Sequence, residues 1–130
     1  MELSNQNILF LTRTMDLGGT ENVILQLCEI FKPCVNKIVV CSKAGVNVEK
    51  LNHMGIEHYD IDDIASKNPV LMLKNYIKIK KIVKYEKITV IHSHHRMAAL
   101  YAQLIAKHNI VKIANAHNTF YDKKILTKIS

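Results

Sequence analysis

Short apolar runs alternate with longer amphipathic segments along this chain, and that alternation constrains the fold more than any other feature of the sequence. The first run, residues 7–12, is nearly continuously apolar, as is typical of a strand buried on both faces of a sheet. In the next segment, apolar residues recur at the three- and four-residue steps of a helix: Val23, Ile24, Leu27, Cys28 and Phe31. Repeated strand-helix-strand units predict a parallel sheet with right-handed crossovers.

Start and stop signals place the individual elements. Thr20 is the expected N-cap of the first helix, which Pro33 ends, and Pro69 begins a long third helix. The predicted strands are 7–12, 37–41, 56–61, 88–92 and 111–116, and the later helices are 46–54, 69–86 and 97–107. We expect one Rossmann-like α/β domain over residues 1–130, with helices on both faces of the sheet and strand order 3-2-1-4-5.

Bulk composition narrows the class of protein. With 48% hydrophobic and 22% charged residues, the chain has the composition of a globular protein with a packed core. No apolar stretch approaches the roughly 20 residues of a membrane span, and the polar N-terminus lacks a signal-peptide core, so we expect a cytoplasmic protein. Cys28, Cys34 and Cys41 form no Cys-x-x-Cys pair and are expected to be reduced. A net charge of +7 favours acidic partners such as nucleotides, phosphates or anionic lipids.

Three polar segments each follow a predicted strand: Gly18-Gly19, the cluster from His92 to Arg96, and His117-Asn118. The carboxyl ends of parallel strands share one edge of a sheet, so these distant segments are expected to converge there. In the order 3-2-1-4-5 the topological switch point lies between the first and fourth strands, and ligands of such folds bind at that point. This edge is the predicted ligand site.

The diglycine has two interpretations. Gly18 and Gly19 precede a helix, where they let the backbone approach a phosphate or carboxylate and present N–H groups to it. The alternative is a tight strand-to-helix turn that requires positive φ. The pattern matches neither Gly-x-Gly-x-x-Gly nor the Walker motif, so it does not support dinucleotide or Walker-type nucleotide binding.

The histidine cluster also has two interpretations. His92 and His94 are two residues apart, so they point to one side of an extended chain. One histidine of the cluster is a candidate base or hydrogen-bond donor near neutral pH, and Arg96 is a candidate phosphate clamp. Alternatively, His92, His94 or His95 caps a strand end or bonds a buried carbonyl.

Zinc is a competing hypothesis for the same residues. His92, His94 and His117 would supply three nitrogen ligands, but no acidic or thiol ligand is placed to complete the set. We therefore expect no metal. His117 and Asn118 are otherwise pocket residues or strand-end hydrogen bonders.

Two charged runs complete the pattern. Asp60, Asp62 and Asp63 suggest a phosphoacceptor site, but the fifth strand lacks the lysine of a receiver domain, so a solvated acidic loop is the preferred interpretation. A lysine-rich helix face either contacts anionic lipid or is simply solvated: Lys74, Lys78, Lys80, Lys81, Lys84 and Lys87. With 6% aromatic residues, nucleic-acid binding is the weaker use of this charge, and we expect none.

In order and spacing, four segments resemble the N-terminal domain of family 4 glycosyltransferases: ILFL at 8–11, LGGTE at 17–21, VIHSHHR at 90–96 and ANAHN at 114–118. The resemblance implies half of a GT-B fold, in which two Rossmann-like domains face each other across a cleft. The N-terminal domain of such enzymes mainly holds the acceptor, and the C-terminal domain mainly holds the nucleotide-sugar. Transfer typically retains the anomeric configuration and needs no essential metal or further cofactor.

The resemblance also assigns residues and partners. Gly18-Gly19 corresponds to the glycine loop near the donor phosphates, His94 to an active-site histidine, and His117 to a residue bordering the acceptor pocket; His92, His95, Arg96 and Asn118 are the further substrate-binding candidates. Acceptors in the family are often lipid-linked saccharides made at the cytoplasmic membrane face, which implies envelope polysaccharide synthesis and a peripheral membrane location.

One departure from the family sets a further expectation. The chain has no second domain, so we expect it to be a truncated or split half that is inactive without a donor-binding domain or separate donor-binding chain. The alternative is a non-catalytic glycan- or membrane-binding assembly subunit.

Overall fold

A computed structural model describes residues 2–15 and 18–114. Its centre is a parallel sheet of five strands: β1 (Asn7–Thr14), β2 (Lys37–Lys43), β3 (Glu57–Asp60), β4 (Val90–Ser93) and β5 (Val111–Ala114). The strand order is β3-β2-β1-β4-β5, as the sequence predicts. β1 and β4 are therefore neighbours, and their carboxyl ends lie side by side at the switch point.

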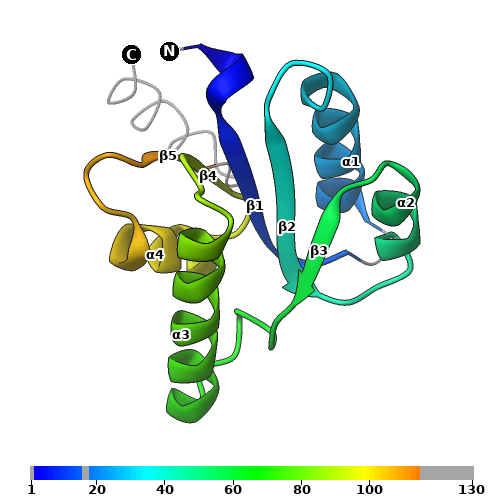
Figure 1. Cartoon of the computed structure of the whole chain (residues 1–130). Helices are drawn as coiled ribbons and strands as arrows, with labels where there is room; N and C mark the ends of the chain where they lie inside the picture. Colours follow the sequence, from blue (N-terminus) through cyan, green and yellow to red (C-terminus); the bar gives the residue numbers. More distant parts are fainter. Residues whose placement is uncertain (1, 16–17, 115–130) are drawn as a thin grey trace.

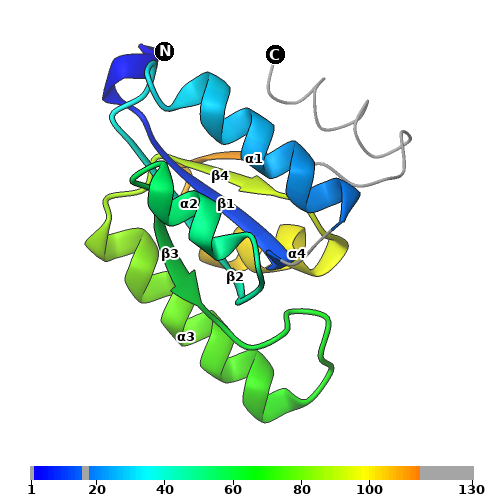
Figure 2. The same cartoon turned by 90° about the vertical axis from the view of Figure 1, so that its right-hand side faces the viewer.

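Helices cover both faces of this sheet. After a short 3-10 turn at Leu3–Asn5, the helices are α1 (Gly19–Phe31), α2 (Val48–His53), α3 (Pro69–Tyr85) and α4 (Arg96–Ile105). α1 and α2 pack on one face, and α3 and α4 pack on the other (Figures 1 and 2). The predicted Rossmann-like α/β class is confirmed.

β1 divides the core into two halves. Ile8 and Phe10 pack with the apolar side chains of α1 and α2, whereas Leu9 and Leu11 pack with those of α3 and α4. All four are buried, because a strand between two helical layers has no solvent face. This explains why the sequence of β1 is nearly continuously apolar.

One predicted helix face is partly wrong, and the apolar residues of a second helix divide between the core and the surface. In α1 the buried residues are Ile24, Leu25 and Cys28, while Val23 is 41% exposed. In α3 the buried row is Asn75, Ile79, Ile82 and Val83, and Leu73 and Ile77 face outward. The reason is that each helix carries more apolar residues than one face holds, so the spacing alone does not select the stripe that meets the sheet.

The cysteines are all unbridged, as expected. Burial raises the pKa of the Cys28 thiol to about 12, and burial also raises the pKa of Cys41, so both stay protonated. Across residues 2–15 and 18–114, none of the helices combines the length and the apolar character that crossing a bilayer would need.

Candidate functional site

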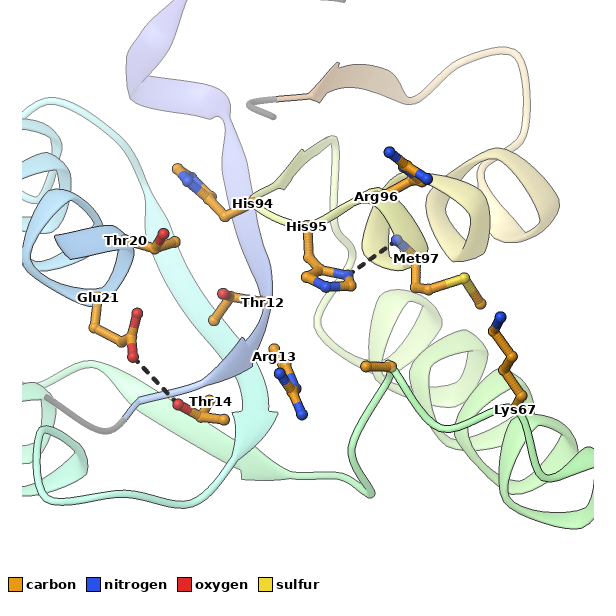
Figure 3. Close-up of a pocket in the computed structure, with 11 residues that line it drawn as sticks. Thr12, Arg13, Thr14, Thr20, Glu21, Lys67, His94, His95, Arg96 and Met97 are labelled. Carbon is orange, nitrogen blue, oxygen red and sulfur yellow. Dashed lines mark hydrogen bonds between the residues drawn. The ribbon is translucent and has the colours of Figure 1, made fainter. Parts of the chain in front are cut away.

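A cleft of about 760 Å³ opens at the carboxyl edge of the sheet, where β1 and β4 lie side by side (Figure 3). The end of β1, the first turn of α1, the loop before α3 and the start of α4 all contribute to its walls. The lining residues are Thr12, Arg13, Thr14, Thr20, Glu21, Ala65, Lys67, His94, His95, Arg96 and Met97. The expected convergence of the first and fourth strand ends is therefore found.

His94 lies at the inner wall of the cleft and is only 6% exposed. Its ring lies 4.2 Å from the ring of His92 and 5.8 Å from that of Phe10, measured between centroids. His92 and His94 thus point to the same face of the sheet, as the two-residue spacing predicts. His92 is half-buried and is not among the residues that line the cleft.

His92 is held neutral by its surroundings. Burial lowers its pKa to about 4, because a charged imidazolium loses hydration beside Phe10 and the strands. Its buried Nε2 atom has no hydrogen-bond partner within the described part of the chain. An aromatic, uncharged His92 therefore supports the ring of His94 from behind.

His95 is the N-cap of α4. Its Nδ1 accepts a hydrogen bond of 3.1 Å from the backbone N–H of Met97, so the neutral ring carries its proton on Nε2. Burial, and then the nearby charge of Arg13, lowers the pKa of His95. His95 therefore caps the start of a helix and not the end of a strand, and it also lines the cleft beside the exposed Arg96.

The diglycine does not adopt the positive φ of the alternative interpretation. Gly18 is extended, with φ 170°, and Gly55 is the one described glycine with positive φ, at 74°. A Cβ added at Gly19 would meet no atom within 4 Å, so the backbone at the start of α1 faces open space. α1 begins at Gly19 with Gly18 as N-cap, so the predicted cap at Thr20 is wrong.

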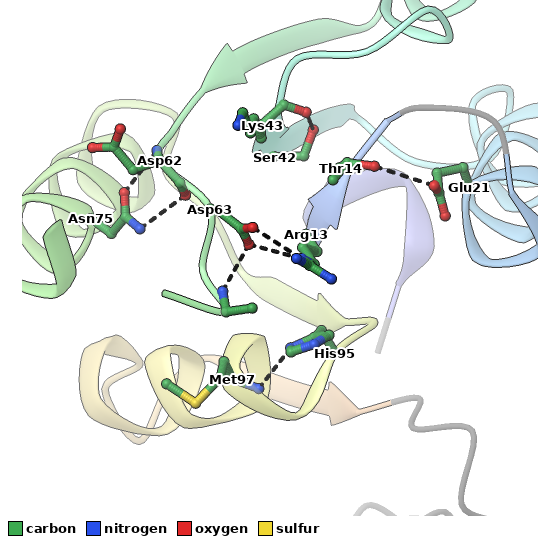
Figure 4. A network of polar contacts seen from close by, with 11 residues as sticks. Arg13, Thr14, Glu21, Ser42, Lys43, Asp62, Asp63, Asn75, His95 and Met97 are labelled. Carbon is green, nitrogen blue, oxygen red and sulfur yellow. Dashed lines mark hydrogen bonds and ion pairs between the residues drawn. The ribbon is translucent and has the colours of Figure 1, made fainter. Parts of the chain in front are cut away.

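A polar network fixes the floor of the cleft (Figure 4). Arg13 at the end of β1 donates from Nε to both oxygens of Asp63, at 3.0 and 3.1 Å, and this pairing lowers the pKa of that carboxyl. Asp63 also accepts a bond from the N–H of Ala65. The prediction of a solvated acidic loop is therefore wrong for Asp63, which is half-buried and forms part of the site.

Asn75 holds that loop from behind. Its buried side chain accepts from the N–H of Asp62 and donates to the carbonyl of the same residue, each at 3.0 Å. This pair of bonds fixes the backbone next to Asp63 and hence the position of Arg13.

We expect Asn75→Ala to lower the free energy of unfolding by about 2 kcal/mol, because it leaves the backbone groups of Asp62 without protein partners in a partly buried place. Asn22→Ala, at an exposed position of α1, is the matched control and should change it by less than about 0.5 kcal/mol. Urea denaturation of both variants measures the difference. Equal effects of the two substitutions would show that the hydrogen bonds of Asn75 to Asp62 do not stabilise the loop.

The wall of the cleft beside α1 carries a carboxylate. Glu21, in the first turn of α1, accepts a bond of 3.3 Å from the hydroxyl of Thr14. Thr12 and Thr20 add further hydroxyl groups to this side. The cleft is thus hydroxyl- and carboxylate-bearing beside α1 and basic beside α3 and α4, as Figure 3 shows.

The predicted site residues fall into four groups. His94, His95 and Arg96 line the cleft; Gly18 and Gly19 adjoin it through Thr20, and His92 lies behind it. His117 and Asn118 lie outside the described residues. Sequence reasoning missed the parts played by Arg13, Glu21 and Lys67, although the position of Arg13 at the end of the first strand was a usable signal. The described residues contain no group of three or more side chains suited to hold a metal ion.

The model of one protein family, described as Glycosyltransferase Family 4, matches residues 17–129. Two solved structures share the fold. A glycosyltransferase from Rickettsia africae ESF-5 superposes with a TM-score of 0.69 at 19% identity, over 95% of this chain and 35% of that one. MurG of Acinetobacter baumannii superposes with a TM-score of 0.64 at 13% identity, over 96% of this chain and 39% of that one. The chain thus spans little more than a third of either protein. No curated protein matches it.

Proposed function

Because this chain belongs to glycosyltransferase family 4, we propose that it forms the acceptor-side domain of a retaining glycosyltransferase. Such an enzyme transfers a sugar from a nucleotide-sugar to a glycan or lipid-linked acceptor, and envelope polysaccharide synthesis at the cytoplasmic membrane face is the proposed setting. The nucleotide-sugar acts as co-substrate, and no further cofactor is proposed.

The cleft at the switch point is the observation that carries this proposal. It joins the end of β1, the open diglycine start of α1 and the histidine-bearing start of α4 in one hollow of about 760 Å³. That volume lies within the range of small-molecule sites, and the position is where open parallel sheets bind ligands. A sugar needs several hydrogen-bonding groups around it, which the threonine hydroxyls and His95 supply here.

Within this cleft we assign His94 to the reacting centre, where its imidazole bonds a sugar hydroxyl or the acceptor nucleophile. Gly18 and Gly19 lie near the donor phosphates in this proposal, and His95 and Arg96 contact substrate. His92 acts through the ring of His94. His117 and Asn118 are proposed to border the acceptor.

A second domain completes the proposed enzyme, since this chain spans only 35% and 39% of the two GT-B proteins it superposes on. We expect the 130-residue chain alone to show no sugar transfer, because the two reactants must be held in register by both halves of the clamp. Transfer should appear when a donor-binding domain is fused to the chain or supplied as a separate chain. The assay measures transfer of radiolabelled sugar from the nucleotide-sugar to a lipid-linked acceptor. Turnover by the chain alone would contradict the proposal.

The outer face of α3 favours a second candidate, a glycan- or membrane-binding assembly subunit. Val70, Leu73 and Ile77 recur at helical spacing and are 66%, 59% and 43% exposed. α3 also carries five lysines and no acidic residue, and Lys78 bonds the carbonyl of Asp60. An apolar stripe beside positive charge is the pattern of a helix that rests on anionic lipid. Either candidate function would use this face.

We expect the chain to bind vesicles of phosphatidylglycerol and not vesicles of phosphatidylcholine. Changing Lys74, Lys81 and Lys84 to Gln should weaken binding roughly 100-fold, since each lysine near an anionic surface contributes about 1 kcal/mol. The matched control changes three exposed lysines on other elements, namely Lys50, Lys107 and Lys112. Cosedimentation measures both. Equal losses in the two triple variants would show that the charge acts without regard to the face of α3.

A further inference from the structure

One side of the cleft carries more positive charge than the binding of neutral sugar hydroxyls needs. Arg13 at the end of β1, Lys67 in the loop before α3 and Arg96 at the start of α4 line this side (Figure 3). Among the described lining residues the one carboxylate, Glu21, lies across the cleft, where it accepts a bond from Thr14. The charges are therefore separated across the hollow.

Arg13 is oriented for a second partner. Of the three guanidinium nitrogens of Arg13, Nε is the one that bonds Asp63, so this pairing leaves the two Nη groups outside it. Those Nη groups form the planar fork that binds two oxygens of a phosphate at once. Because the N–H of Ala65 bonds Asp63 and Asn75 fixes the backbone of the adjacent Asp62, Arg13 is held in place before a ligand arrives.

In the view of Figure 3, His95 lies between Arg13 and Arg96. Its Nδ1 is engaged by the N–H of Met97, so the neutral ring presents Nε2–H as a donor. After burial, the charges of Arg13 and Arg96 both lower its pKa, against the opposing effect of Asp63. Arg13, His95 and Arg96 all line the same cleft.

We propose that the basic side of the cleft is a phosphate subsite, in which Arg13, Lys67 and Arg96 bind a phosphate or diphosphate group of the acceptor. The assignment to the acceptor rests on the proposed function. It is favoured by position, because the subsite lies across the cleft from the diglycine of α1 and adjoins the first turn of α3 through Lys67. An acceptor resting against the lysine-bearing face of α3 would bring its phosphate to this point.

Inorganic pyrophosphate, titrated into the full chain at low ionic strength, tests the subsite by ¹H–¹⁵N NMR. We expect saturable shifts at Arg13 Nε–H and at the amides of Lys67 and residues 95–97. Arg13→Gln and Arg96→Gln should each weaken binding about tenfold, as loss of a charge-assisted hydrogen bond does. Lys50→Gln removes the same charge from α2 and should change affinity less than twofold. Shifts of equal size along the lysines of α3, or no saturable shift, would overturn the proposal.

Kinetics of the completed two-domain enzyme distinguish the source of the phosphate. If it belongs to the acceptor, Arg96→Gln raises the KM for a phosphorylated acceptor about tenfold and leaves the KM for the nucleotide-sugar unchanged. A raised KM for the nucleotide-sugar alone would overturn the assignment to the acceptor. Pyrophosphate binding without any sugar transfer would count against the proposed function and not against the subsite.

Discussion

His94→Ala is expected to reduce sugar transfer by the completed enzyme at least 100-fold while the chain still folds. The imidazole lies at the inner wall of the cleft and is the histidine of the cluster that both lines the hollow and lies against His92. A positioned histidine that exchanges a proton or donates a hydrogen bond in the transition state typically contributes a factor of about 100 to 10,000. The measurement is the initial rate of transfer at saturating nucleotide-sugar.

Two controls separate chemistry from folding. His108→Ala changes an exposed histidine after α4 and should leave the rate within twofold. Thermal unfolding of the His94→Ala chain reports any loss of packing against Phe10, because these two rings lie 5.8 Å apart. A folded His94→Ala enzyme with the wild-type rate would remove His94 from the mechanism.

Acid is expected to destabilise the chain well before its carboxylates protonate. His92 has a pKa of about 4 in the folded chain and about 6.5 when unfolded, so the unfolded chain binds the extra proton first. Its contribution is complete above pH 6.5 and is lost as the pH falls from 6.5 towards 4. Between pH 7.5 and pH 5 the loss should be about 2 kcal/mol, and it approaches about 3 kcal/mol near pH 4.

The histidine origin of this effect can be isolated. Burial also lowers the pKa of His58 and of His95, so these histidines add to the loss of stability in the same direction. The pKa values of Asp63 and Glu86 are also lowered in the folded chain, so the stability that these carboxylates contribute is lost only below about pH 4.5. His92→Leu should reduce the fall between pH 7.5 and pH 5 by about 2 kcal/mol, and His108→Leu should not reduce it. Urea denaturation at the two pH values gives both numbers. An unchanged pH dependence in His92→Leu would contradict the burial argument.

The fold was predictable from sequence because local signals and topology rules agree. Pro33 and Pro69 mark the end of α1 and the start of α3 to within two residues, and the apolar run of β1 identifies the central strand. The doubly wound pattern of strands and helices then predicts the order of the strands. The errors concern one helix face and one helix cap: Val23 is apolar yet exposed, since α1 has more apolar residues than the sheet covers, and Gly18 caps α1 in place of Thr20.

The candidate site was predictable only in part. His94, His95 and Arg96 come from one segment at the switch point, so strand-end reasoning finds them. The Arg13–Asp63 pair joins residues separated by 50 positions. It also depends on Asn75 of α3, which fixes the backbone next to Asp63. No local pattern encodes such tertiary pairs, which is why Asp63 was interpreted as solvated. The cap formed by His95 likewise required the ring orientation and not just the residue type.

The most direct test of the proposed site is a crystal structure of the chain joined to its donor-binding domain, with a nucleoside diphosphate and an acceptor saccharide bound. We expect the acceptor in the cleft between Thr12 and Arg96, with an accepting hydroxyl within hydrogen-bond distance of the His94 ring. An acceptor bound elsewhere, on the face of α3 or against β5, with this cleft empty of both ligands, would contradict the assignment.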